Sequence, residues 1–89
     1  MVQLKISITG RVQGVGFRQY TAHHARRLKL RGFVRNLPDG SVECLAGGEE
    51  ETMKSFLALL QKGPPFSRVD QVQTNPVNSE LPDHFQITN

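Results

Sequence analysis

The stretch of the chain best suited to chemistry is residues 10–18, whose letters read GRVQGVGFR. Gly14 and Gly16 can adopt positive φ angles, so a ligand can approach the main chain closely there. Successive N–H groups in such a bend can converge on one point and bind an anion. If a helix begins directly after the glycines, its free N–H groups and the positive end of its dipole point to the same place. The stretch therefore predicts a phosphate-binding loop.

Arg18 closes this stretch and would lie in the first turn of that helix. Its guanidinium carries a planar fork of donors that matches phosphate oxygens. A cation at this end of a helix opposes the dipole, and a bound anion would reverse that conflict. The alternative interpretation is a tight strand-to-helix turn followed by a solvated arginine. Nucleotide loops fit poorly, because Gln19 stands where the dinucleotide fingerprint needs a third glycine, and no Gly-Lys-Ser/Thr sequence occurs.

The elements that must position this loop follow from hydrophobic periodicity. Apolar and polar residues alternate over residues 2–9, which predicts a half-buried strand ending at Gly10. Met53, Phe56 and Leu60 belong to one apolar stripe, which predicts a helix that begins near three glutamates and ends before Gly63. The other expected elements are a helix at 18–29, strands at 33–37, 41–47 and 68–74, a polar loop at 75–83, and a short closing strand at 85–87.

This order predicts an α+β fold of the ferredoxin-like βαββαβ type, in one domain spanning residues 1–89. Its four-stranded antiparallel sheet would carry two helices on one face, with a short C-terminal strand added. Eighty-nine residues with 37% hydrophobic and 21% charged residues fit such a domain.

Charge is unevenly distributed along the chain. Residues 1–38 contain eight Lys or Arg and no Asp or Glu, whereas residues 39–89 contain three basic and eight acidic side chains. This asymmetry favours an anionic partner near the first half. The longest apolar run is four residues, there is no signal-like segment, and the one cysteine cannot form an internal disulfide. We therefore expect a cytoplasmic protein that does not associate with membranes and is by default a monomer.

Two longer patterns make the interpretation specific. The letters ITGRVQGVGFR at residues 8–18 resemble the first signature of the acylphosphatase family, and GFVRN at residues 32–36, followed by Gly40, Val42 and Gly48, resembles the second. GPP at 63–65 and FQI at 85–87 extend the resemblance over nearly the whole chain. Departures from the family pattern lie outside the signatures, at Cys44 and in the polar loop.

The resemblance implies hydrolysis of acyl phosphates to a carboxylate and inorganic phosphate, without a metal or cofactor. It implies that Arg18 binds the phosphoryl oxygens and that Asn36 positions the attacking water. It also implies that a backbone loop cradles the phosphoryl group, which gives as expected phosphate-binding residues Arg11, Val12, Gln13, Gly14, Val15, Gly16, Phe17 and Arg18. Such chemistry depends on positioning and charge stabilisation, and a carboxylate leaving group needs no protein acid.

The residues also admit other interpretations. Asn36, just before a Pro-Asp-Gly turn, could be a turn residue. The fold is shared with RNA-recognition motifs, although the outward positions of the first strand and the 41–47 strand hold no aromatic residue on which a base could stack; we expect no nucleic-acid partner. A binding or carbamoyl-transfer module, as at the start of hydrogenase-maturation carbamoyltransferases, is a third class. A chain ending at Asn89 favours a free-standing enzyme.

The remaining reactive side chains suit structural roles. Cys44 alternates with Val42 and Ala46 and is expected on the inner face of a strand. His23 and His24 are adjacent on a helix, about 100° apart, and cannot share a metal ion. His84 is expected at the surface.

Overall fold

The structure is a computed structural model that describes residues 1–88 of the chain. Its elements, in chain order, are β1 (Val2–Arg11), α1 (Phe17–Arg27), β2 (Arg31–Asn36), β3 (Val42–Gly48), α2 (Glu50–Lys62), β4 (Arg68–Pro76) and β5 (Phe85–Ile87). Both helices and every strand expected from the sequence are present. Among residues 1–88, no helix is long and apolar enough to cross a membrane.

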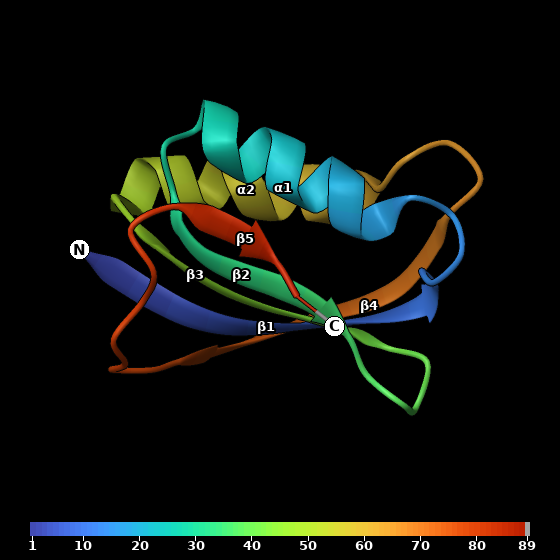
Figure 1. Ribbon diagram of the computed structural model, residues 1–89. Coiled ribbons are helices and arrows are strands. Elements are labelled where there is room, and N and C mark those ends of the chain that lie inside the picture. Colours follow the sequence, from blue (N-terminus) through green and yellow to red (C-terminus); the bar gives the residue numbers. More distant parts are fainter. Residues whose placement is uncertain (89) are drawn as a thin grey trace.

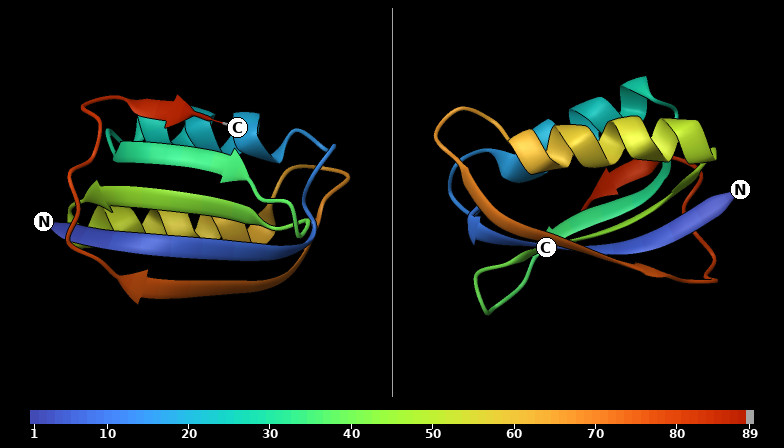
Figure 2. Two further views of the ribbon diagram at one scale, coloured as in Figure 1. Left: turned by 60° about the horizontal axis from the view of Figure 1, so that its bottom comes forward. Right: turned by 180° about the vertical axis from the view of Figure 1, so that it is seen from behind.

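The strands form one sheet in the order β4-β1-β3-β2-β5. The pairs among β1, β2, β3 and β4 are antiparallel, and β5 is added in parallel beside β2. Figure 1 shows both helices on the same face of the sheet, and the left view in Figure 2 looks onto the opposite, open face. α1 packs over β2 and β5, whereas α2 packs against β1, β3 and β4. The predicted ferredoxin-like α+β fold is confirmed.

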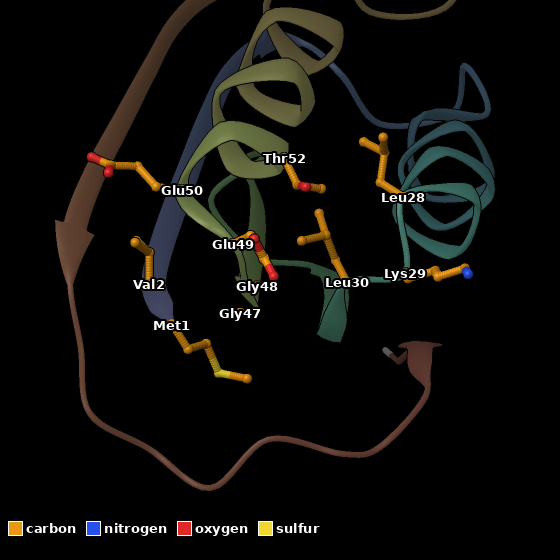
Figure 3. Close-up of a pocket in the computed structure, with 10 residues that line it drawn as sticks. All are labelled: Met1, Val2, Leu28, Lys29, Leu30, Gly47, Gly48, Glu49, Glu50 and Thr52. Carbon is orange, nitrogen blue, oxygen red and sulfur yellow. The ribbon is translucent and has the colours of Figure 1, made fainter.

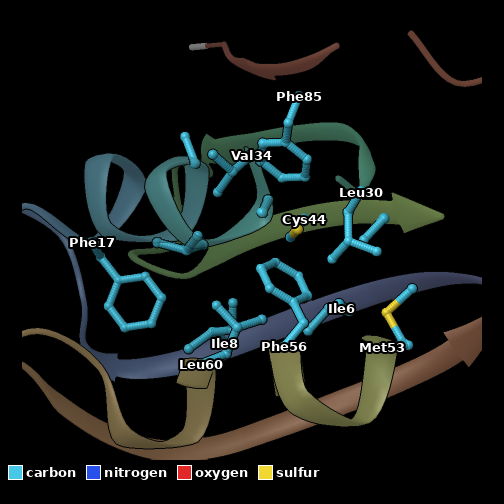
Figure 4. Close-up of a cluster of buried hydrophobic side chains, with 14 of the residues drawn as sticks. Ile6, Ile8, Phe17, Leu30, Val34, Cys44, Met53, Phe56, Leu60 and Phe85 are labelled. Atoms are coloured by element: carbon cyan, nitrogen blue, oxygen red, sulfur yellow. The ribbon is translucent and has the colours of Figure 1, made fainter. Parts of the chain in front are cut away.

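The core lies between the sheet and the helices (Figure 4). Alternation in β1 turns Ile6 and Ile8 inward, where both are fully buried. The stripe of α2 meets them through Phe56 and Leu60, which are also fully buried. This packing fixes the layer of strands beneath the helices, and with it the strand ends that carry the loops.

Several element boundaries differ from the prediction. β1 continues past Gly10 to Arg11, because a bulge at Thr9/Gly10 lets the strand keep pairing with β4. α1 stops at Arg27, and Lys29 adopts a left-handed φ of 59°. β4 extends to Pro76, so the predicted loop begins two residues later than expected. Within that loop Leu81 is buried, and a side chain at Gly47 would collide with it.

Cys44 lies on β3 with no exposed surface, as predicted. Burial, with a smaller contribution from the neighbouring Glu43 carboxylate, raises the pKa of its thiol. Because only the thiolate reacts, we expect an aromatic disulfide reagent to label the native protein about 10³-fold more slowly than the denatured chain. Absorbance of the released thiolate, with and without guanidinium, measures this ratio. Rapid labelling under native conditions would contradict the burial.

Phe66, in the connection between α2 and β4, combines a left-handed φ of 62° with a side chain that is 87% exposed. A residue with a Cβ is strained in this conformation by about 1–2 kcal/mol, whereas glycine is not. We expect Phe66→Gly to stabilise the protein by up to about 1 kcal/mol, since glycine also raises the entropy of the unfolded chain. Phe66→Ala is the matched control, because it removes the ring and keeps the strain. Urea unfolding midpoints compare the two; an equal gain in both variants would assign the effect to the ring.

Candidate active site

A small hollow of about 130 Å³ lies where β1 runs into α1. Its walls come from the loop after β1, the first turn of α1 and the ends of β2 and β5, which Figures 1 and 2 show converging at one end of the molecule. The residues lining it are Val12, Gly14, Gly16, Phe17, Arg18, Gln19, Asn36 and Ile87. At this volume the hollow is well below the roughly 300–1,000 Å³ typical of pockets for drug-sized ligands, so it suits a small ligand.

The loop backbone has the predicted glycine geometry. Gly14 and Gly16 adopt left-handed φ angles of 76° and 79°, and Gly16 is the N-cap of α1. A Cβ at either glycine would meet nothing within 4 Å, so glycine is required there by the backbone conformation rather than by crowding. No side chain caps the N-terminus of α1. The N–H groups of the first turn have no partner within the helix. The first three residues of α1, Phe17, Arg18 and Gln19, line the hollow.

Arg18 lies in the first turn of α1, as predicted, and is half-buried. Its Nη1 donates a hydrogen bond of 3.2 Å to the carbonyl oxygen of Thr88. The N–H of Thr88 in turn donates to the carbonyl of Val34 on β2, at 2.8 Å. The C-terminal segment therefore holds the guanidinium against the rim of the hollow. Since a carbonyl carries no net charge, this contact orients Arg18 without cancelling its charge.

Asn36 is the last residue of β2 and lines the same hollow as Arg18. Its side-chain Oδ1 is buried and has no hydrogen-bond partner among residues 1–88. Buried polar atoms are nearly always paired, so an unpaired amide oxygen on a residue that lines the hollow marks Asn36 as a candidate partner for a polar ligand. The sequence alone could not show that Asn36 and Arg18 meet, because they belong to elements that only the folded sheet brings together.

Gln13 connects the loop to the hairpin that follows Asn36. Its Nε2 donates to the carbonyl oxygens of Leu37, at 2.8 Å, and Ser41, at 2.9 Å. Both partners are acceptors, which fixes the orientation of the amide group with the nitrogen toward them.

The lining differs in part from the expected phosphate-binding set. Arg11 is the last residue of β1, lies opposite Arg68 of β4 in the sheet and is exposed. Neither Gln13 nor Val15 lines the hollow. Gln19 and Ile87 line it without having been predicted. Gln19 follows Arg18 directly, so its place in the first helical turn was a usable signal. Ile87 carried no such signal, because its position depends on the pairing of β5 with β2.

Part of the positive charge of the first half is neutralised away from the small hollow, by two carboxylates. On the open face of the sheet, the buried Glu43 carboxylate accepts from Arg35 Nε at 2.8 Å and lies 3.7 Å from Lys5 Nζ. The Arg35 guanidinium also lies over the ring of Phe33, an aromatic residue on this face of the sheet. Arg31 pairs with Asp83. The basic asymmetry is therefore partly structural.

A larger hollow of about 790 Å³ lies at the opposite end of β1 (Figure 3). Met1, Leu28, Leu30 and glycines 47 and 48 form much of its wall, and Glu49 and Glu50 lie at its edge. Among residues 1–88, Lys29 is the one cationic side chain in this lining, against the two carboxylates, and this balance does not favour an anionic ligand. This hollow does not fit the chemistry predicted for the loop.

The histidines are separate from the small hollow. His23 is exposed and His24 is half-buried with its ring edge-on to Tyr20. Burial, together with the charges of His23, Arg27 and Lys62, lowers the pKa of His24. Within residues 1–88, no three His, Cys, Asp or Glu side chains are grouped closely enough to hold a metal ion.

The arrangement defines a class of protein: a ferredoxin-like α+β fold in which an uncapped helix N-terminus, an arginine and an amide face one small hollow. Comparison with known proteins identifies the family. The sequence model of the acylphosphatase family matches residues 4–87. The chain therefore belongs to the acylphosphatase family of hydrolases, as the resemblance of its two signatures indicated.

Individual relatives match this chain over its whole length. The acylphosphatase of Bacillus licheniformis is 52% identical over 89 residues, covering 100% of this chain and 97% of that protein. The crystal structure of acylphosphatase from Bacillus subtilis superposes with a TM-score of 0.94 at 40% identity, covering 100% of both chains. The structure of HypF from T. kodakarensis matches with a TM-score of 0.88 at 32% identity, covering 100% of this chain but only 12% of that one.

Proposed function

We propose that this chain hydrolyses the carboxyl–phosphate bond of acyl phosphates by direct attack of a water molecule on phosphorus. The products are a carboxylate and inorganic phosphate. The observation that carries the proposal is that Arg18 and Asn36, from α1 and β2, line one small hollow together with the first turn of α1. Membership of the acylphosphatase family supports the substrate class.

In this proposal, the loop over residues 11–17, of which Val12, Gly14 and Gly16 line the hollow, and the first turn of α1 bind the phosphoryl oxygens. Free backbone N–H groups there donate hydrogen bonds, and the positive end of the helix dipole favours the negative charge. Arg18 adds a charged fork of donors. These groups stabilise the charge on the equatorial oxygens in the transition state, which is the main requirement of phosphoryl transfer. The Thr88 carbonyl keeps the guanidinium oriented before substrate arrives.

Asn36, which lines the hollow and has an unpaired amide oxygen, orients the attacking water. An amide both donates and accepts hydrogen bonds, and it adds no negative charge that would repel the phosphate. The water oxygen forms a bond to phosphorus as the bond from phosphorus to the acyl oxygen breaks, and the carboxylate leaves with the electron pair. No Asp, Glu or His is among the residues that line the hollow within the described chain. We assign the proton of the water to a phosphoryl oxygen of the substrate, because that oxygen is the basic group at hand.

Hydrolysis of benzoyl phosphate tests the proposal directly. Purified protein, assayed with a chelator present, is expected to release benzoate at a rate well above the spontaneous reaction, and inorganic phosphate is expected to inhibit competitively. Absence of hydrolysis would overturn the proposal. An inert protein that still binds phosphate would instead be a binding module, and salt-sensitive binding of oligoribonucleotide by an inert protein would favour an RNA-binding role.

A further inference from the structure

We infer that the side chain of Gln13 is a positioning residue, which holds the phosphate-binding loop in register with Asn36. The inference rests on the proposed function and deepens it. It assigns the alignment of water with phosphorus to a side chain that lies outside the hollow. Gln13 belongs to the loop, but its amide nitrogen points away from the hollow and into the hairpin that joins β2 to β3.

The two hydrogen bonds of Gln13 flank the position of Asn36. Asn36 is paired across the sheet with Val42. Leu37 directly follows Asn36 and Ser41 directly precedes Val42, and these are the two residues whose carbonyls accept from Gln13 Nε2, at 2.8 and 2.9 Å. The amide group of Gln13 is therefore hydrogen-bonded to both chain segments that leave the Asn36–Val42 pair, at Leu37 and at Ser41.

The hairpin is a firm anchor for this contact. The Leu37 N–H donates to the Ser41 carbonyl at 2.9 Å, and the Gly40 N–H donates to the Leu37 carbonyl at 3.1 Å. The Asp39 carboxylate accepts from the hydroxyl and the N–H of Ser41, and these two hydrogen bonds lower the pKa of Asp39. Because the two carbonyls keep these partners without Gln13, its removal loosens the loop and leaves the turn intact.

The consequence for the reaction is geometric. The loop places phosphorus, and β2 places the water on Asn36; the two elements are joined in sequence only through the whole of α1. Attack in line depends on their relative position, and a misplacement of about 1 Å can cost about 10²-fold in rate. Arg18 and the first-turn N–H groups of α1 do not depend on Gln13 for their position, because α1 packs on β2 and β5 and Thr88 holds the guanidinium. These groups keep binding phosphate when the loop loosens. Gln13 should therefore affect kcat more than phosphate affinity.

The test compares Gln13→Met, which keeps the length of the side chain without its donors, with Gln61→Ala, an exposed glutamine of α2 as the control. With benzoyl phosphate, Gln13→Met is expected to lower kcat about tenfold or more, with the inhibition constant of phosphate changed less than about twofold. Gln61→Ala should match the wild type. A parallel rise of the inhibition constant, or an unchanged kcat, would overturn the inference.

A double-mutant cycle separates positioning from general damage. Because Gln13 acts through Asn36, adding Gln13→Met to Asn36→Ala should lower kcat further by less than about twofold. Effects that multiply would mean that Gln13 acts independently and would overturn the inference. An inactive wild type would overturn the proposed function instead. In that case the NMR signals of the Asn36 side-chain amide still test the contact: they should shift in Gln13→Met and stay in place in Gln61→Ala, and the reverse would refute it.

Discussion

Replacing Arg18 with alanine is expected to abolish phosphate binding and turnover together. The variant should lose about 10³-fold or more in kcat/KM with benzoyl phosphate, which is the range found when an arginine that stabilises a transferring phosphoryl group is removed. The inhibition constant of inorganic phosphate should rise steeply as well, because the guanidinium binds the same oxygens in substrate and product. Steady-state kinetics with phosphate as inhibitor measures both quantities.

The control for this variant is Arg27→Ala, which removes the same charge from the last turn of the same helix. It should keep activity near the wild-type level, and only the small benefit of a cation at a helix C-terminus is lost. Arg18→Ala also loses the hydrogen bond to Thr88, which costs about 1 kcal/mol, so urea unfolding should show a folded protein. Arg18→Lys keeps the charge but not the planar fork, and intermediate activity is expected. Full activity of the alanine variant would remove Arg18 from the mechanism.

Replacing Asn36 with alanine should have the second large effect and a different signature. Turnover should fall about 10²–10³-fold, as when one aligned hydrogen-bonding group is removed from an active site. Phosphate should still bind with nearly unchanged affinity, since the loop and Arg18 remain in place. This separation of kcat from the inhibition constant distinguishes a residue that orients water from one that binds the phosphoryl group.

Two further variants sharpen the Asn36 result. Asn75→Ala, at an exposed position of β4, is the control and should behave as the wild type. Asn36→Asp keeps the shape and adds a negative charge beside the phosphate, so phosphate binding should weaken as well. If Asn36→Ala lowered unfolding stability strongly while leaving kcat intact, the asparagine would be a turn residue and not part of the reaction.

The local elements could be predicted from the sequence because each is decided by neighbouring residues. The alternation that begins at Val2 and the apolar stripe from Met53 to Leu60 indicated a strand and a helix, and both are present. The ends of the elements are decided by pairing with a neighbouring strand, which local sequence does not specify. β1 passes through a bulge to reach Arg11, and β4 continues to Pro76 because β1 lies beside it. Leu81, predicted in a polar loop, is buried because the sheet brings it against Gly47.

The candidate site divides in the same way. The residue types in the loop, the start of the helix after Gly16 and the two family signatures are properties of short segments. The sequence alone therefore identified the family and the fold, and it predicted Arg18 and Asn36 as the functional pair. Three features of the site depend on segments far apart in the chain. They are the hydrogen bond from Arg18 to Thr88, the place of Ile87 at the wall of the hollow, and the hydrogen bonds from Gln13 to Leu37 and Ser41. Local patterns carry no record of such contacts, because they arise when strand pairing places the C-terminal strand and the β2–β3 hairpin beside the loop. The sequence therefore specified which residue types are present in the loop and the first helical turn. The packing of the sheet decided how these residues are placed relative to one another.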